Sequence, residues 1–254
     1  MATFAHGVPC WIDMGNREVD AAATFYAELL GWDVPEADEE MGGYRVATLD
    51  GKAVAGLSPM QETPGPAFWT TYVNVDDADA TCARASEAGG SVLMPAMDVM
   101  DLGRMAILAD PAGAAFGLWQ AGTFAGVETD NGPGALCWNE LITDDTEGSK
   151  AFYAQALGWG ERTSDGGGMV YTEWQVDGRS VGGMMAKPPM MPAGAPNFWG
   201  VYFAVTDVDA ALAKATGLGG SAMTGIIDSP AGRFVPIADP TGAGFSLIEL
   251  PGEG

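Results

Sequence analysis

The strongest constraint on the fold is an internal repeat that spans most of the chain. The segment Phe25–Trp32 (FYAELLGW) returns as Phe152–Trp159 (FYAQALGW), and Ala109–Phe116 (ADPAGAAF) returns as Ala238–Phe245 (ADPTGAGF). The two pairs are separated by 127 and 129 residues, so the register between the copies holds over almost the whole sequence. A chain of 254 residues with this register is expected to form two domains, residues 1–122 and 123–254.

Each half contains a second, weaker repeat in which a strand is followed by a helix and further strands. Strand patterns open the units, and helices are expected after an Asn16 N-cap through Leu30 and over residues 78–88, 147–157 and 208–216. The sequence therefore predicts an α+β protein of four βαβββ units, at about residues 8–57, 68–120, 135–186 and 198–250. It leaves open whether the first unit pairs with the second or with the fourth.

Charge restricts the partners. With 34 Asp+Glu against 11 Lys+Arg, the formal net charge is −23, which disfavours binding to nucleic acid or to an anionic membrane surface. No apolar run is long enough to span a membrane, and the N-terminus lacks a signal-peptide pattern. We therefore expect a cytoplasmic monomer or homodimer whose partner is a small molecule.

Cysteine and histidine usage disfavours nucleophilic catalysis. Cys10 and Cys137 are repeat equivalents that precede Trp11 and Trp138 on strand-like segments, and buried reduced thiols are a better interpretation than a redox or nucleophilic pair. The one histidine, His6, lies near a terminus that we expect to be mobile, so neither thiol has a partner to activate it.

These motifs together resemble a known family. An opening strand, a helix ending in Phe-Tyr-x-x-x-Leu-Gly-Trp, and an Asp-Pro-x-Gly-x-x-Phe turn into a last strand are similar to the vicinal oxygen chelate superfamily, which includes glyoxalase I, bleomycin-resistance proteins and extradiol dioxygenases. The resemblance covers essentially the entire chain and is closest to two-domain actinobacterial members labelled glyoxalase-like proteins or hydroxylases. It implies two curved eight-stranded half-barrels, each around a ligand cavity, with the helices outside.

The same resemblance locates the family's metal ligands. They come from the opening strand, 14 residues before the helix Phe, and from the last strand, seven residues after the turn Asp. These positions fall on Trp11, Trp138, Gly117 and Ser246, and the opening positions of the second and fourth units fall on Thr70 and Gly200. None is a histidine or a carboxylate, so we expect no metal and no other cofactor.

Strand alternation assigns one face to every second residue and predicts which side chains line the cavity. The inward set is expected to hold a flat or apolar molecule through aromatic contacts and limited hydrogen bonding. Alternatively, Trp11 and Trp138 only fill the space of a lost metal, and Tyr72 and Tyr202 belong to the framework. Asn139 falls on the helix-facing side, where a polar residue is unexpected. The predicted substrate-binding residues are Trp11, Thr70, Tyr72, Trp119, Trp138, Tyr202 and Ser246.

Two acids belong to the same inward set. Asp13 and Glu140 each follow the inward Trp by two residues, and a carboxylate in an aromatic pocket suits a general acid or base near neutral pH. Alternatively, they are solvated or pair with Arg104 or Arg233 at the cavity mouth. Those two arginines, each preceded by glycine, either bind an anionic substrate group or, more simply, anchor a loop to a carboxylate.

Three functions follow. The leading hypothesis is metal-independent binding or cofactor-free tailoring of a hydrophobic or aromatic small molecule, possibly a secondary metabolite, with Asp13 and Glu140 as the catalytic residues. The second is a metal-dependent lyase, isomerase or dioxygenase with displaced carboxylate ligands such as Asp13, Glu140, Asp98 or Asp228. The third is an interaction protein with vestigial cavities. Whether the chain is an enzyme, and which ligand it takes, stay open.

Overall fold

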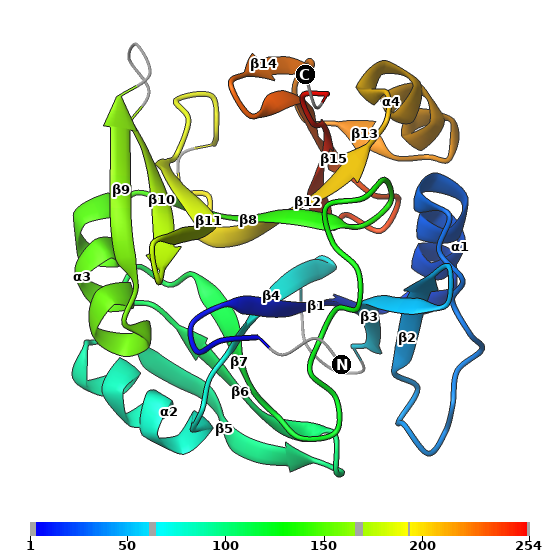
Figure 1. Ribbon diagram of the computed structural model, residues 1–254. Coiled ribbons are helices and arrows are strands. Elements are labelled where there is room, and N and C mark those ends of the chain that lie inside the picture. Colours follow the sequence, from blue (N-terminus) through cyan, green and yellow to red (C-terminus); the bar gives the residue numbers. More distant parts are fainter. Residues whose placement is uncertain (1–3, 61–64, 166–169, 193, 253–254) are drawn as a thin grey trace. The chain divides into compact units, whose positions relative to one another are not determined.

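The computed structural model describes residues 4–60, 65–165, 170–192 and 194–252 (Figure 1). It confirms the α+β class and four modules, each of which opens with a strand and a helix. The first module comprises β1 (Pro9–Asn16), α1 (Val19–Leu30), β2 (Arg45–Leu49) and β3 (Lys52–Pro59), and the second β4 (Phe68–Asn74), α2 (Ala78–Glu87), β5 (Ser91–Val99), β6 (Gly103–Ala109) and β7 (Ala115–Ala121). The third comprises β8 (Leu136–Thr143), α3 (Thr146–Leu157), β9 (Gly160–Asp165), β10 (Val170–Val176) and β11 (Arg179–Ala186), and the fourth β12 (Phe198–Val205), α4 (Val208–Gly217), β13 (Ser221–Ala222), β14 (Ile227–Ser229), β15 (Gly232–Ala238) and β16 (Gly244–Glu249).

Within the described residues, the sheets have seven and nine strands where eight each were expected. Their strand orders are β2-β3-β1-β4-β7-β6-β5 and β13-β15-β16-β12-β8-β11-β10-β9, with β14 pairing to β15. The first sheet lacks one strand because the segment after α1 forms only an isolated bridge between Asp33 and Thr48. The second gains one because the fourth module adds the short strand β14 beside β15.

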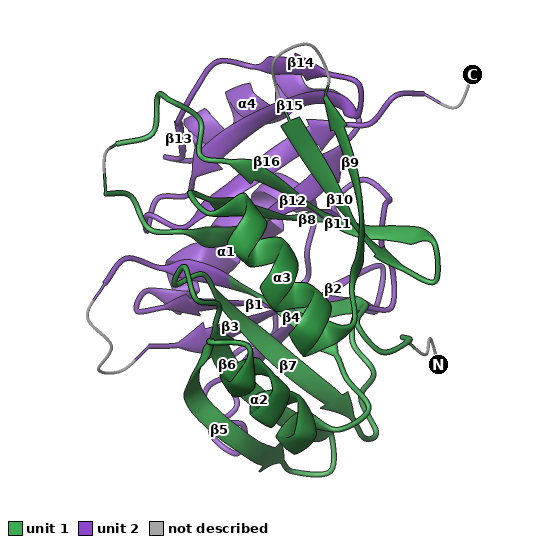
Figure 2. Ribbon diagram, turned by 90° about the vertical axis from the view of Figure 1, so that its left-hand side faces the viewer, with its two compact units in different colours: residues 1–11, 70–126, 139–200 green, residues 12–69, 127–138, 201–254 purple. Residues whose placement is uncertain are grey.

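Contacts divide the chain into two compact units that differ from the two sequence halves (Figure 2). Unit 1 holds residues 1–11, 70–126 and 139–200, and unit 2 holds residues 12–69, 127–138 and 201–254. The second and third modules therefore form most of unit 1, where α2 packs against α3, and the first and fourth modules form most of unit 2, where α1 packs against α4. The division of the chain into folding domains at residues 122 and 123 stays a prediction.

Helix ends follow the sequence signals with one correction. Asn16 is not the N-cap of α1, because the helix begins two residues later than expected and Glu18 is the N-cap; Asn16 Oδ1 instead accepts the Glu18 N–H at 2.8 Å. Gly31 and Gly158 close α1 and α3 in left-handed conformations, at φ 79° and 73°, which glycine adopts without strain.

The repeated motifs that mark the duplication meet in the core as a buried Trp–Tyr–Asp chain of hydrogen bonds. In unit 2, Trp69 Nε1 donates to Tyr26 Oη at 3.2 Å, and Tyr26 Oη donates to Asp239 Oδ2 at 3.1 Å. The other carboxylate oxygen of Asp239 accepts the backbone N–H of Ala243 at 3.0 Å, within the Asp-Pro-x-Gly turn. The chain thus joins the helix of the first module to the turn of the fourth.

Unit 1 contains the same chain. Trp199 Nε1 donates to Tyr153 Oη at 2.8 Å, Tyr153 Oη donates to Asp110 Oδ2 at 3.2 Å, and Asp110 Oδ1 accepts the Ala114 N–H at 2.8 Å. It joins the helix of the third module to the turn of the second. The combination of modules in each compact unit therefore rests on residues that the repeat conserves within this chain.

Burial fixes the direction of these hydrogen bonds. Tyr26 and Tyr153 have no exposed surface, and burial, followed by the adjacent carboxylate, raises the pKa of each hydroxyl well above its usual range. Each hydroxyl is therefore protonated and donates to its aspartate. Each ring also stacks on the Trp that ends its motif, with ring centroids 5.3 Å apart for Trp32 and 5.2 Å apart for Trp159.

We predict that Tyr26→Phe and Tyr153→Phe each lower the free energy of unfolding by about 1–3 kcal/mol, because the buried aspartate and indole N–H lose their shared partner. Chemical denaturation measures this effect. Ser86→Ala, which removes an exposed helical hydroxyl, is the control and is expected to stay within about 0.5 kcal/mol of the parent. An equally small change in the tyrosine variants would contradict a stabilising role for the Trp–Tyr–Asp chain.

Candidate functional site

The predicted site residues alternate along their strands with the residues of the two hydrophobic cores. Ile12 and Met14 belong to the core of unit 2, whereas Val73, Phe116 and Leu118 belong to the core of unit 1, under the helices. The side chains between them along each strand leave from the opposite face of the sheet. Whether that face binds a ligand stays a prediction.

An aromatic cluster lies on this face in unit 1. The ring of Phe124 packs edge-on against Trp11 and Trp119, with centroids 4.9 Å and 6.2 Å apart, and its carbonyl oxygen accepts the Trp119 Nε1–H at 2.9 Å. Trp11 and Trp119 are both buried. Phe124 was missed by the sequence analysis, because it lies in an irregular segment after β7 where no periodicity assigns a face.

Tyr72 explains why one expected ligand position is glycine. Tyr72 and Gly117 are register partners on the parallel strands β4 and β7, and a Cβ atom at Gly117 would overlap the Tyr72 ring. A ligating side chain at residue 117 is therefore incompatible with this ring position. In unit 2, Tyr202 and Ser246 are register partners in the same way on β12 and β16. Thr70 and Ser246 are buried, and Trp138 and Tyr202 are half-buried.

The two predicted acids occupy equivalent places in different units. Asp13 is half-buried in unit 2 and lies opposite Gly56 of β3. Glu140 lies in unit 1 opposite Gly183 of β11, and only 6% of its surface is exposed.

A second carboxylate, that of Glu173, lies on the same face of the sheet as Glu140. Gly183 is also the register partner of Glu173, so Glu140 and Glu173 lie two strands apart on one face, with Cα atoms about 10 Å apart. Hydrogen bonds, first from Ser180 and then from Arg162, lower the pKa of Glu173. Glu173 is not among the predicted site residues, although its repeat equivalent Val46 is apolar and this difference marks the position.

The two arginines of the Gly-Arg pairs bind carboxylates of this chain, as the simpler interpretation predicted, and these carboxylates lie on neighbouring helices and strands. Arg104 pairs with Asp79 at 2.9 Å and with Asp98 at 2.8 Å. Arg233 pairs with Asp209 at 2.8 Å and with Asp228 at 3.5 Å. The hydrogen bond from Arg104 lowers the pKa of Asp79. Asp98 and Asp228, two of the four acids considered as displaced metal ligands, thus pair with arginine.

The residues do not fit the metal centre that the resemblance implies. Among residues 4–60, 65–165, 170–192 and 194–252, no group of three or more His, Cys, Asp and Glu side chains is placed to hold a metal ion. The ligand positions carry indole rings, glycine and a serine hydroxyl. A metal-free site stays a prediction.

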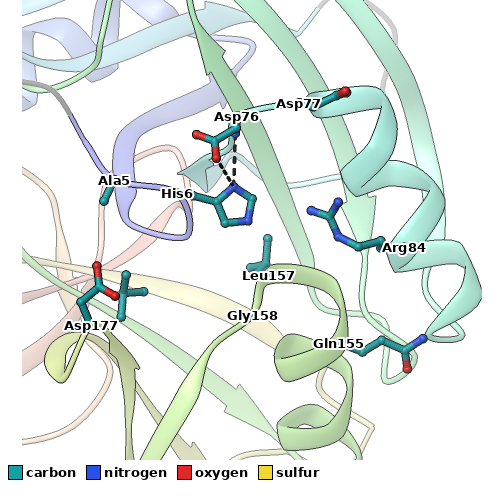
Figure 3. A pocket seen from close by; sticks show the side chains of 10 residues that line it. Ala5, His6, Asp76, Asp77, Arg84, Gln155, Leu157, Gly158 and Asp177 are labelled. Atoms are coloured by element: carbon teal, nitrogen blue, oxygen red, sulfur yellow. Dashed lines mark hydrogen bonds and ion pairs between the residues drawn. The ribbon is translucent and has the colours of Figure 1, made fainter.

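A surface pocket lies elsewhere in unit 1, between the N-terminal segment, α2 and the end of α3 (Figure 3). It has a volume of about 660 Å³ and a charged lining that includes His6, Asp76, Arg84 and Asp177. His6 Nδ1 accepts the Asp76 N–H at 3.2 Å. No predicted site residue lines this pocket.

The equivalent thiols are held as structural groups. Cys10 Sγ donates to the Tyr72 carbonyl at 3.6 Å, and Cys137 Sγ donates to the Tyr202 carbonyl at 3.3 Å. Burial raises the pKa of both thiols, that of Cys137 to about 12. A thiol with so high a pKa is protonated near neutral pH and is a poor nucleophile.

Comparison with known proteins identifies the family. The model of the "Glyoxalase/Bleomycin resistance protein/Dioxygenase superfamily" matches residues 11–118 and 126–247. The chain belongs to this superfamily. A protein of Mycobacterium tuberculosis (strain CDC 1551 / Oshkosh) named "Putative glyoxylase CFP32" is 42% identical over 97% of this chain and 96% of its own length. "Anthracycline biosynthesis protein DauV" of Streptomyces sp. (strain C5) is 40% identical over 98% of this chain and 96% of its own length.

Solved structures agree on the superfamily fold. The 2,2',3-trihydroxybiphenyl 1,2-dioxygenase of Sphingomonas wittichii strain RW1 superposes with a TM-score of 0.65 at 16% identity, covering 98% of this chain and 93% of its own. The Mn(II)-bound glyoxalase of Novosphingobium aromaticivorans superposes with a TM-score of 0.64 at 17% identity, covering 98% of this chain and 84% of its own. At this identity the likeness concerns the fold alone. No helix of the described residues has the length and apolar character needed to cross a bilayer.

We predict that Cys10 and Cys137 resist alkylation by iodoacetamide at pH 7.5 in the folded protein, because their raised pKa values leave almost no thiolate. Mass spectrometry of peptides from native and denatured samples measures the modification. Alkylation of all three cysteines is expected after denaturation, which serves as the control. Rapid modification of Cys10 or Cys137 in the native protein would restore a nucleophilic role.

Proposed function

We propose that this protein binds a hydrophobic or aromatic small molecule without a metal ion and modifies it without a cofactor. The observation that carries the proposal is the composition of the sheet face opposite the helices. Residues at the superfamily's ligand positions offer no set of metal donors, whereas the same face carries tryptophan, tyrosine and two carboxylates. Flat aromatic walls with few polar groups suit a flat, apolar ligand.

The named relatives support a ligand from secondary metabolism. Two Streptomyces proteins about as long as this chain are named for anthracycline biosynthesis, and each is 40% identical to it. Anthracyclines are fused-ring hydroxyquinones, so an anthracycline aglycone is a suitable first probe.

The site residues divide into two roles. In unit 1, Trp11 and Trp119, braced by Phe124, provide aromatic surface, and Thr70 and Tyr72 provide hydroxyls. Trp138, Tyr202 and Ser246 provide the corresponding groups in unit 2. Asp13 and Glu140 are the proposed acid–base groups, because proton transfer is the chemistry that a carboxylate performs without a metal.

We predict that the protein binds an anthracycline aglycone with unchanged affinity before and after dialysis against EDTA, because no step of recognition uses a metal. Quenching of tryptophan fluorescence on titration measures the affinity, and elemental analysis of the same samples measures bound metal. A loss of binding in EDTA that one particular divalent ion restores would support the metal-dependent alternative instead. Absence of binding by any fused-ring aromatic compound would support a vestigial cavity.

We further predict that Asp13→Asn and Glu140→Gln, combined in one protein, lower catalysed proton exchange by about 10²–10⁴-fold, because the amides cannot accept the substrate proton. The probe is 2-tetralone, a fused-ring ketone with acidic α-hydrogens, in D2O, and proton NMR follows deuterium incorporation. Glu87→Gln, an equivalent change at an exposed site on α2, is the control and is expected to exchange at the parental rate. Exchange at the parental rate in the double variant would exclude the acid–base role.

A further inference from the structure

Tyr44, a residue that neither the sequence motifs nor the superfamily positions single out, lies beside Asp13. It directly precedes β2, after a turn in which Gly42 and Gly43 adopt left-handed conformations at φ 62° and 82°. The turn closes with the Tyr44 N–H donating to the Met41 carbonyl at 3.1 Å. This local structure directs the half-buried Tyr44 side chain back over the sheet.

Gly56 shows where the phenol ends. A Cβ atom at Gly56 would overlap Tyr44 Oη and would lie 3.0 Å from Asp13 Cβ. Since Asp13 and Gly56 are register partners on parallel strands, the Asp13 side chain and the Tyr44 hydroxyl are neighbours on the face opposite the helices. The absence of a side chain at residue 56 is what lets the phenol reach this place.

We propose that Tyr44 and Asp13 form a proton-transfer pair that acts on a carbonyl-bearing ligand; this inference rests on the proposed function and assigns its chemistry to the first module. The Asp13 carboxylate accepts the proton of the carbon next to the carbonyl while the Tyr44 hydroxyl gives its proton to the carbonyl oxygen. The electron pair of the broken C–H bond forms the C=C bond of the enol. Transfer of the proton from Asp13 to the Tyr44 phenolate restores both groups, so the ketone becomes its enol with no oxidant, reductant or cofactor.

The equivalent positions of the third module carry a different set of side chains. Asp13, Gly56 and Tyr44 correspond there to Glu140, Gly183 and Tyr171, but Val46, the register partner of Gly56, corresponds to Glu173. Glu173 is bound to Arg162 and Ser180, so the row of register partners that begins at Glu140 ends in a charged network, whereas the row that begins at Asp13 ends in an apolar side chain. This difference is the reason for assigning the carbon-acid chemistry to the first module.

The test uses Tyr44→Phe in the full-length protein, with exchange of 2-tetralone in D2O as the readout. The variant keeps the ring over Gly56 and removes only the proton donor, so we expect an unchanged melting temperature, a dissociation constant within twofold of the parent and an exchange rate about 10²-fold lower. Gly56→Ala, whose new methyl group would displace the phenol oxygen, is expected to lower the rate similarly. Tyr171→Phe, the repeat equivalent, is the matched control and is expected to exchange at the parental rate.

The outcomes separate this inference from the proposed function. Parental exchange in Tyr44→Phe together with slow exchange in Asp13→Asn would overturn the role of Tyr44 and leave the proposed function intact. Equal losses in Tyr44→Phe and Tyr171→Phe would overturn the assignment to the first module. Binding of 2-tetralone without catalysed exchange in the parent protein would overturn the proton-transfer pair, and absence of binding by both 2-tetralone and the aglycone would overturn the proposed function as well.

Discussion

The buried Trp–Tyr–Asp chain is the interaction on which the rest of the structure depends. In each compact unit it connects an opening strand, a helix and a turn that come from different modules, through groups with little or no exposure to solvent. A buried hydroxyl, indole N–H or carboxylate that loses its partner costs more than the hydrogen bond contributes, so the three groups constrain one another. The repeated motif therefore stabilises the fold of each unit, which explains why both copies keep it.

The two halves differ on both faces of the sheets. On the helix-facing side, buried Ala47 corresponds to buried Trp174. The opposite face carries Val46 in one half and Glu173 in the other at equivalent positions, and Gly117 corresponds to Ser246. A polar pair also lies on the helix-facing side, where Thr71 Oγ1 donates to Asn139 Oδ1 at 2.8 Å and both side chains are buried. The equivalents of this pair are Val201 and Ile12, both in the apolar core of unit 2. A polar pair replaced as a pair leaves no buried group unsatisfied.

Much of the fold was predictable because it depends on local and periodic signals. The four helices, most strands and the sides on which Ile12, Met14, Val73 and Phe116 lie follow from alternation and from capping residues. The combination of modules in each unit was not, because it depends on contacts such as Tyr26 with Asp239, which no local pattern encodes. Asn16 was wrongly predicted as the N-cap of α1. Its side chain does accept a backbone N–H, but that N–H belongs to Glu18, which is itself the N-cap. Phe124 lies outside the regular strands, where alternation assigns no face, and the face taken by Tyr44 depends on the turn before β2 and on the space over Gly56.

The difference between Val46 and Glu173 shows how a duplicated scaffold acquires unequal sites without a change of fold. The Asp13–Gly56 pair is provided by strand register, which the duplication keeps as Glu140–Gly183. The two modules differ at the residue that pairs with the glycine from the next strand. Val46, which is apolar, pairs with Gly56, whereas Glu173, which binds Arg162, pairs with Gly183. An apolar residue in the row reduces the solvation of a carboxylate and so favours its acceptance of a proton, whereas an arginine in the row stabilises the charge of carboxylates near it. Strand register thus fixes the position of the carboxylate, and the residues on the neighbouring strands determine whether it is suited to accept a proton from carbon.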